Sequence, residues 1–549
     1  MPPDADRRED PAGLRYRTYG MMKIVSAQTA KELIHASPEI AVLDVREYGQ
    51  FGDGHLLFAS SCPYSVLEKR ILDLVPNTAT PCLLYDAGDG VGRKAARRIA
   101  ELGYTNILTV DGGAPGWQEA GFPLFAGVNV PSKAFGEMVE AARHTPHIDS
   151  EELALWSKEG KAFLLVDTRP PTEHARMTLP GAVSLPNGEL IHRLHALGLP
   201  PETPIILHCA GRTRGLIGTQ TLIDAGVENP VFAFENGTQG WALSGRELLR
   251  GQSPAPMPEL SPGSLADSAR RAENFIARYS IPVIDGAQME EWRADPSRST
   301  YLLDVRSRRE YDEGHRAGSI HAPVVQIVQA TDEWVAVRRA RLALIDDSGM
   351  RAATAAYWLR QLGFDAAVVR GALEGGLISK EDAAFRPADL PTITAEEIVR
   401  QEGQGITIVD LRTSAAYRTA HPTGALWGIR PRLDRLPLPK TGIAALLADD
   451  PGLASLAAQD LSEHIPGLNL RLLDGGLEAW IQAGGKVEAS ADMPSSADAI
   501  DFLAFLHDRH NGNLESARRY LAWETGLIQQ LDARDLAEFH LAAGIENHA

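Results

Sequence analysis

Short apolar runs alternate with amphipathic stretches along most of the chain, and this alternation predicts strands separated by helices. Runs such as "PCLLYD", "PIILHC" and "RLALID" are typical of buried strands, while "RKAARRIAELG" and "AATAAYWLRQLG" have helical spacing of apolar residues and end in Gly, the usual stop of a helix. Strands that alternate with helices indicate a parallel sheet covered by helices on both faces. We therefore predict an α/β fold.

The pattern repeats four times with closely matched spacing, which indicates four tandem domains. Each repeat has an apolar strand that ends in Asp-x-Arg, and the four pairs are Asp44/Arg46, Asp167/Arg169, Asp304/Arg306 and Asp410/Arg412. Eleven residues after each Asp stand His55, Thr178, His315 and His421. A second apolar strand ends 42, 42, 42 and 39 residues after the Asp, at Asp86, Cys209, Asp346 and Asp449.

The repeats divide the chain into four units and a tail. Units one to four are expected at residues 22–125, 148–250, 279–386 and 389–487, followed by a helical C-terminal extension at 488–549. A short linker helix is expected before unit two, and the Pro/Ser-rich "GQSPAPMPELSPGS" before unit three predicts a flexible linker. The extension is interpreted either as the remnant of a further unit or as a docking helix.

The composition of the chain argues against some classes of binding partner and indicates a cellular compartment. The formal net charge of −18 over 549 residues argues against nucleic acid or an anionic membrane as a partner. Three cysteines, without a Cys-x-x-Cys or Cys/His ligand spacing, predict neither a disulfide framework nor a metal site, and no cofactor motif is present. With no signal peptide and no apolar run near the ~18 residues of a membrane span, the sequence predicts a cytoplasmic protein. It leaves the oligomeric state open.

The stretch "HCAGRTRG" at the end of the second strand of unit two has the composition of a reactive thiol site. A thiol between a strand and a helix faces the positive end of the helix dipole and free backbone N–H groups, and Arg212 and Arg214 add positive charge. Together these groups predict a pKa below the ~8.5 of free cysteine. Gly211 and Gly215 let the loop curl around an anion. Cys82, inside an apolar strand, and Cys62, in a loop of small residues without basic neighbours, are interpreted as small core residues.

The Asp-x-Arg strands, the His or Thr that follows them, Cys209 and the closing "DGG…W" motifs resemble the rhodanese family of sulfurtransferases, and in particular multi-domain bacterial thiosulfate sulfurtransferases. The resemblance implies four tandem rhodanese-like domains, of which unit two is active. It implies that Cys209 takes a sulfane sulfur from thiosulfate or a similar donor and passes it to cyanide or a thiol acceptor. The substrate-binding loop would comprise Ala210, Gly211, Arg212, Thr213, Arg214 and Gly215, whose N–H groups hold the persulfide and whose arginines attract the donor.

Two other functions stay open. Rhodanese-fold phosphatases and arsenate reductases resemble this loop, but they have one more residue between Cys and the distal Arg than the four between Cys209 and Arg214. A scaffold that carries a persulfide or binds protein partners is the other alternative.

The repeats also suggest roles for residues other than the cysteine. The acidic residues Asp86, Asp346 and Asp449 are expected to make units one, three and four inactive and to cap the helices that follow. Asp167 and Arg169 are expected to form a structural ion pair, and Thr178 has no role that the sequence explains.

Overall fold

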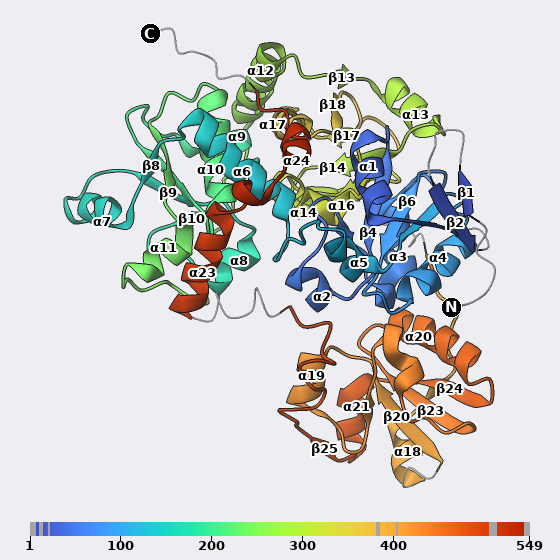
Figure 1. The fold of residues 1–549 in the computed structure, drawn as a ribbon. Helices are drawn as coiled ribbons and strands as arrows, with labels where there is room; N and C mark the ends of the chain where they lie inside the picture. The colour runs from blue at the N-terminus through green and yellow to red at the C-terminus, as the bar shows by residue number, and fades with distance from the viewer. Residues whose placement is uncertain are drawn as a thin grey trace.

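The structure is a computed structural model that describes residues 7–9, 15–19, 22–379, 385–401, 405–503 and 513–542 (Figure 1). Four parallel sheets share one strand order: when only the five strands of each parallel sheet are counted along the chain, the first is followed by the fifth, fourth, second and third. These orders are β3-β7-β6-β4-β5, β8-β12-β11-β9-β10, β13-β18-β17-β14-β15 and β19-β24-β23-β20-β22. The predicted α/β fold with four repeated parallel sheets is confirmed.

Unit one is preceded by two strands that extend its sheet, β1 (Arg7–Glu9) and β2 (Arg15–Tyr19). Its own elements are β3 (Met22–Val25), α1 (Ala27–Ala36), β4 (Ile40–Asp44), α2 (Tyr48–Asp53), β5 (Ser60–Ser61), η1 (Tyr64–Val66), α3 (Leu67–Leu74), β6 (Cys82–Tyr85), α4 (Val91–Glu101), β7 (Ile107–Val110) and α5 (Gly113–Glu119).

Unit two follows the 14-residue helix α6 (Val130–Arg143), which packs along α10. Its elements are β8 (His147–Ile148), α7 (Ser150–Lys158), β9 (Leu164–Asp167), α8 (Pro171–Arg176), β10 (Val183–Ser184), α9 (Glu189–Arg193), η2 (Leu194–Leu197), β11 (Ile205–His208), α10 (Thr213–Asp224), β12 (Val231–Phe234) and α11 (Gly237–Leu243). The short linker helix expected here is therefore a longer helix of the core, because Val130, Phe135 and Val139 are buried.

Unit three begins with a long helix that packs against α17. Its elements are α12 (Pro262–Tyr279), β13 (Val283–Ile284), α13 (Gly286–Ala294), β14 (Thr300–Asp304), α14 (Arg308–Glu313), β15 (Ile320–His321), α15 (Val324–Gln329), α16 (Thr331–Trp334), β16 (Val337–Arg338), β17 (Arg341–Ile345), α17 (Met350–Gln361) and β18 (Asp365–Val369). Strand β16 leaves its own unit and pairs antiparallel with β4 of unit one, which the repeat pattern did not predict.

Unit four and the C-terminal extension complete the chain. Unit four contains β19 (Thr392–Ile393), α18 (Ala395–Arg400), β20 (Ile406–Asp410), α19 (Ser414–Thr419), β21 (His421–Pro422), β22 (Leu426–Trp427), η3 (Arg430–Arg435), β23 (Gly442–Leu447), α20 (Pro451–His464), β24 (Leu468–Leu473), α21 (Gly476–Gln482) and β25 (Val487–Glu488). The extension contains α23 (Leu514–Thr525), η5 (Ile528–Gln530) and α24 (Ala533–Ala537).

The extension docks on other units and does not begin a fifth sheet within the residues that the structure describes. Helix α23, red in Figure 1, lies against α11 and α6 beside unit two. Near α24, Glu538 accepts hydrogen bonds from Arg338 and Arg339 of unit three at 2.6 Å, and Asp535 pairs with Lys31 of unit one at 2.7 Å. Of the two interpretations of the tail, the docking element fits this arrangement.

Units one, two and three share one continuous apolar core. Trp358 on α17 shows how they join, because its ring packs edge-on against Phe135 of α6 and its Nε1–H donates to Thr221 of α10 at 2.8 Å. Among the described helices, none combines the length and the hydropathy that crossing a lipid bilayer requires.

Unit four has its own apolar clusters and contacts unit one through buried charge. Arg430, which is 2% exposed, donates to both carboxylate oxygens of Glu68 at 2.6 and 2.7 Å and to Asp460 at 3.0 Å. Arg98 of unit one donates to the same Asp460 at 2.5 Å. The interface therefore depends on a network of alternating charges.

We predict that Arg430→Ala destabilises the attachment of unit four by about 3–5 kcal/mol, because it leaves the buried Glu68 carboxylate without the guanidinium that binds both of its oxygens and leaves Asp460 with Arg98 alone. Differential scanning calorimetry should show a new transition at lower temperature. Arg309→Ala is the control, since Arg309 is exposed and pairs with Glu313 only at 3.8 Å. An Arg430→Ala melting profile identical to the wild type would contradict the prediction.

Candidate active site in unit two

The backbone holds Cys209 at the carboxyl end of β11, where the chain turns into α10. The Cys209 carbonyl accepts a hydrogen bond from the Thr238 N–H at 2.9 Å, and the Ala210 carbonyl accepts one from the Gln239 N–H at 3.1 Å. Gly237 makes this contact possible, since its φ is +53° and a Cβ there would lie 2.2 Å from the Cys209 carbonyl oxygen. The start of α11 thus clamps the loop of residues 209–215, called here the Cys209 loop.

The Cys209 thiol is buried, and this changes its predicted acidity. Burial raises the pKa of Cys209 above its ordinary value, while the positive charge of Arg214 and a hydrogen bond from the Gly215 N–H lower it, and the carboxylate of Glu524 raises it. The sequence-based prediction of a lowered pKa is wrong for this structure. The lowering groups are present as expected, but desolvation outweighs them.

Both arginines of the Cys209 loop are already paired with carboxylates. Arg214 donates to the two oxygens of Glu173 on α8 at 2.6 and 2.9 Å. Arg212 donates to Glu137 on α6 at 2.7 Å and also to Glu140. The sequence predicted that Arg212 and Arg214 add positive charge around the thiol. In the structure carboxylates compensate both charges, so this prediction is corrected.

The predicted Asp167–Arg169 pair is fully buried, and Asp167 pairs in the sheet with His208, the residue before Cys209. Arg169 donates to the two carboxylate oxygens of Asp167 at 2.8 and 2.7 Å, and its Nη2 also donates to the Met177 carbonyl at 2.5 Å. Thr178 donates its hydroxyl to Asp167 at 2.9 Å, and His174 Nδ1 lies 3.1 Å from the same carboxylate. Thr178 thus has a role that the sequence did not reveal.

In the other units the residue that corresponds to Thr178 is a histidine stacked on an aromatic ring four residues earlier. The ring centroids are 3.9 Å apart for Phe51 and His55, 3.9 Å for Tyr311 and His315, and 3.7 Å for Tyr417 and His421. Unit two has His174 and Thr178 instead, which places two polar groups on Asp167.

Burial lowers the pKa of the neighbouring His208 to about 4, so its imidazole is neutral near pH 7.

Unit one shows what the equivalent loop binds when it carries a carboxylate. Asp86 accepts hydrogen bonds from the N–H groups of Gly88 at 2.9 Å, Gly90 at 3.0 Å and Gly92 at 2.8 Å. Gly92 stands six residues after Asp86, as Gly215 stands six residues after Cys209. The loop that leads from strand to helix in this fold therefore holds an anion on backbone N–H groups.

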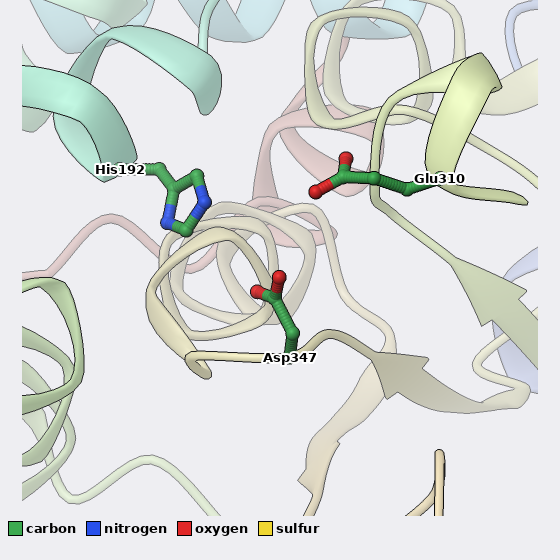
Figure 2. A group of neighbouring side chains, drawn as sticks. All are labelled: His192, Glu310 and Asp347. Carbon is green, nitrogen blue, oxygen red and sulfur yellow. The ribbon is translucent and has the colours of Figure 1, made fainter. Parts of the chain in front are cut away.

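Unit three fills the same position with a buried ion pair. Asp346 accepts from the N–H of Arg351 at 2.9 Å and from its Nε at 2.8 Å. His192, Glu310 and Asp347 converge beside this pair, with candidate ligand atoms within 4.8 Å of one another (Figure 2). Arg351 donates to Glu310 at 2.8 Å and to Asp347 at 3.0 Å, so the protein's own guanidinium supplies the positive charge between these carboxylates.

Unit four departs from the predicted equivalence. In units one to three the Asp of the Asp-x-Arg motif pairs with a residue of the neighbouring strand, and the next residue along that strand is Asp86, Cys209 or Asp346. In unit four Asp410 pairs with Leu447, so the equivalent residue is Ala448. Asp449 is exposed, and the helix cap is Asp450, whose carboxylate accepts from the Gly452 N–H at 2.8 Å. The assignment of Asp449 is therefore wrong, because unit four has a shorter connection between the two strands.

Comparison with known proteins agrees with this architecture. The family model described as "Rhodanese-like domain" matches residues 26–120, 149–244 and 287–377. The chain belongs to this family. The three matched ranges lie in units one to three, and unit four has the same strand order, so the chain has four rhodanese-like units.

Individual proteins are similar over the whole chain or over one unit. The crystal structure of a thiosulfate sulfurtransferase from Pseudomonas aeruginosa is 37% identical, with a TM-score of 0.85 over 94% of this chain and 99% of that chain. The uncharacterised protein YqhL of Bacillus subtilis is 30% identical over 17% of this chain and 74% of that protein. The dual specificity phosphatase Cdc25 of Arabidopsis thaliana is 27% identical over 21% of this chain and 86% of that protein.

The sequence did not reveal the carboxylates that surround the Cys209 loop. Glu137 lies before the unit, Glu173 lies on a short helix within it, and Glu524 lies in the C-terminal extension. No spacing relates these residues to Cys209, since each reaches the loop through tertiary packing. Only the helical character of their segments was visible in the sequence.

We predict that alkylation of Cys209 by iodoacetamide continues to accelerate above the pKa of about 8.5 of a free thiol. Because the folded-state pKa is raised, the thiolate population at pH 7 is small and grows as the pH rises through that raised value. The pH at the midpoint of the rate profile reports the pKa of the thiol. The accessibility of the thiol to iodoacetamide changes only the maximal rate at high pH. Cys209→Ser is the control, since burial raises the pKa values of Cys62 and Cys82 to about 12. A midpoint below that of a free thiol would contradict the prediction.

Proposed function

We propose that this chain is a sulfurtransferase in which Cys209 takes a sulfane sulfur from thiosulfate or a similar donor and passes it to cyanide or a thiol. One observation carries the proposal: Cys209 stands where the equivalent loop of unit one holds the Asp86 carboxylate on three backbone N–H groups. A thiol at such a position can form a persulfide whose terminal sulfur is stabilised as an anion. The resemblance to the thiosulfate sulfurtransferase of Pseudomonas aeruginosa supports the same reaction.

The chemistry needs no cofactor. The Cys209 thiolate attacks the outer sulfur of thiosulfate, a new S–S bond forms, and sulfite leaves with the electron pair of the broken S–S bond. Cyanide or a thiolate then attacks the outer sulfur of the persulfide, and Cys209 leaves as the thiolate. The Gly215 N–H and the charge of Arg214, which both favour the thiolate, would assist each step.

The Cys209 loop also bears on the phosphatase alternative. Four residues separate Cys209 from Arg214, one fewer than in the rhodanese-fold phosphatases that the loop resembles. A shorter ring of N–H groups suits one sulfur atom better than a tetrahedral phosphate.

We also propose a reducing compartment such as the cytoplasm, because none of the three cysteines forms a disulfide.

We predict that incubation with thiosulfate adds the mass of one sulfur atom to the intact chain, and that cyanide removes it as thiocyanate. The adduct should be absent from Cys209→Ser and present in Cys62→Ala, which removes a buried thiol away from the Cys209 loop. If the adduct forms but thiocyanate production is unaffected by Cys209→Ser, the persulfide-carrier scaffold becomes the better explanation. If no donor modifies Cys209 and phosphate esters are hydrolysed, the chain is a phosphatase.

We predict opposite effects for the two partners of the Arg214–Glu173 pair. Arg214→Gln should lower kcat/KM for thiosulfate by about tenfold or more, because it removes a charge that favours both thiolate and anionic donor. Glu173→Gln should raise kcat/KM, because it leaves the Arg214 charge uncompensated while its amide oxygen can still accept a hydrogen bond. Steady-state kinetics with thiosulfate and cyanide measures both. A decrease of equal size in both variants would indicate a purely structural ion pair.

A further inference from the structure

The C-terminal extension places a carboxylate directly on the Cys209 loop. Glu524, on α23, accepts a hydrogen bond from the Thr213 hydroxyl at 2.9 Å through its Oε1. Its side chain closes over the loop, since a Cβ on Gly211 would lie 2.7 Å from Glu524 Oε2 and 3.1 Å from the Tyr520 ring. A residue more than 300 positions away in sequence thereby becomes part of the wall beside Cys209.

The second oxygen of this carboxylate faces the loop without a hydrogen bond. Glu524 is 1% exposed, and among the described residues its Oε2 has no hydrogen-bond partner. Lys133 of α6 lies over the rings of Tyr520 and Trp523, 5.5 and 5.0 Å from their centroids, and donates to the Val128 carbonyl. A buried carboxylate oxygen in this condition repels any anion that enters the loop.

The charges that contact the Cys209 loop sum to a negative value. Its two arginines, Arg212 and Arg214, bind three carboxylates, Glu137, Glu140 and Glu173. Glu524 adds a fourth carboxylate through Thr213. A donor with two negative charges would meet more repulsion here than a donor with one.

We propose that Glu524 determines the donor class of Cys209 by favouring sulfane-sulfur donors with at most one negative charge, such as thiosulfonates and persulfides, over the thiosulfate dianion. This inference rests on the proposed sulfurtransferase function. With a thiosulfonate, the Cys209 thiolate forms an S–S bond to the outer sulfur, the donor's S–S bond breaks, and a sulfinate leaves with its electron pair. The step is balanced without an added oxidant or reductant.

The test compares two donors that differ by one charge. Methanethiosulfonate replaces one charged oxygen of thiosulfate by a methyl group and carries a single negative charge. In Glu524→Gln, kcat/KM for thiosulfate divided by kcat/KM for methanethiosulfonate should rise about tenfold over the wild type, because one unit of charge repulsion is removed. The ratio cancels the different intrinsic reactivities of the donors. The amide oxygen of Gln can still accept the Thr213 hydrogen bond.

Two control variants separate charge from structure. Glu515→Gln makes the same change on the exposed start of α23 and should leave the donor ratio unchanged. Glu524→Asp keeps the charge and should keep the wild-type ratio. If Glu524→Gln loses activity with both donors to the same extent, so that the donor ratio does not rise, the inference is overturned and Glu524 is a structural residue.

The outcomes also distinguish this inference from the proposed function. If Cys209 forms a persulfide and the ratio is the same in Glu524→Gln and the wild type, the inference fails and the sulfurtransferase function stands. If neither donor adds sulfur to Cys209 in intact-mass measurements of any of these proteins, the proposed function itself fails, and the inference fails with it.

Discussion

The buried Asp–Arg pair at the carboxyl ends of β4, β9, β14 and β20 is the interaction on which the repeated architecture depends. In every unit the arginine donates to the aspartate two residues before it and reaches the backbone carbonyl eight residues ahead, which are Gly54, Met177, Gly314 and Ala420. The pair therefore fixes where the chain leaves the sheet and how the next helix returns. Because an isolated buried charge is very costly, neither partner can change alone. This constraint explains why the motif survives in units that carry no thiol.

The units differ in the residue that follows the sheet partner of this Asp. Unit one uses the Asp86 carboxylate on backbone N–H groups, and unit three combines Asp346 with Arg351. Unit four has Ala448 there and no side-chain acceptor at that position. Unit two has a neutral thiol instead, whose burial opposes ionisation. Units one and three thus fill the position with a carboxylate and unit four fills it with an alanine, whereas unit two places a nucleophilic thiol there.

The sequence predicted the parts of the structure that local spacing determines. The parallel sheets follow from alternating strands and helices, and the position of Cys209 at a strand end follows from the 42-residue spacing it shares with Asp86 and Asp346. The same spacing failed for unit four, because a shorter connection moved Ala448 into the position expected for Asp449. The acidity of Cys209 could not be predicted, since the burial of its thiol and the approach of Glu524 both result from packing between distant segments. The pairing of β16 of unit three with β4 of unit one could not be predicted for the same reason.

The packing of the extension connects units one and three physically to the Cys209 loop of unit two. Near α24, Asp535 pairs with Lys31 of unit one and Glu538 pairs with Arg338 and Arg339 of unit three, while Glu524 on α23 contacts the Cys209 loop. Units one and three therefore anchor the segment that carries Glu524, and their positions relative to unit two determine how closely that carboxylate approaches the thiol. A single rhodanese-like domain could form the Cys209 loop, but it would lack this carboxylate. Through this segment units one and three contribute to the charge around Cys209, although their own loops carry Asp86 and Asp346 in place of a thiol.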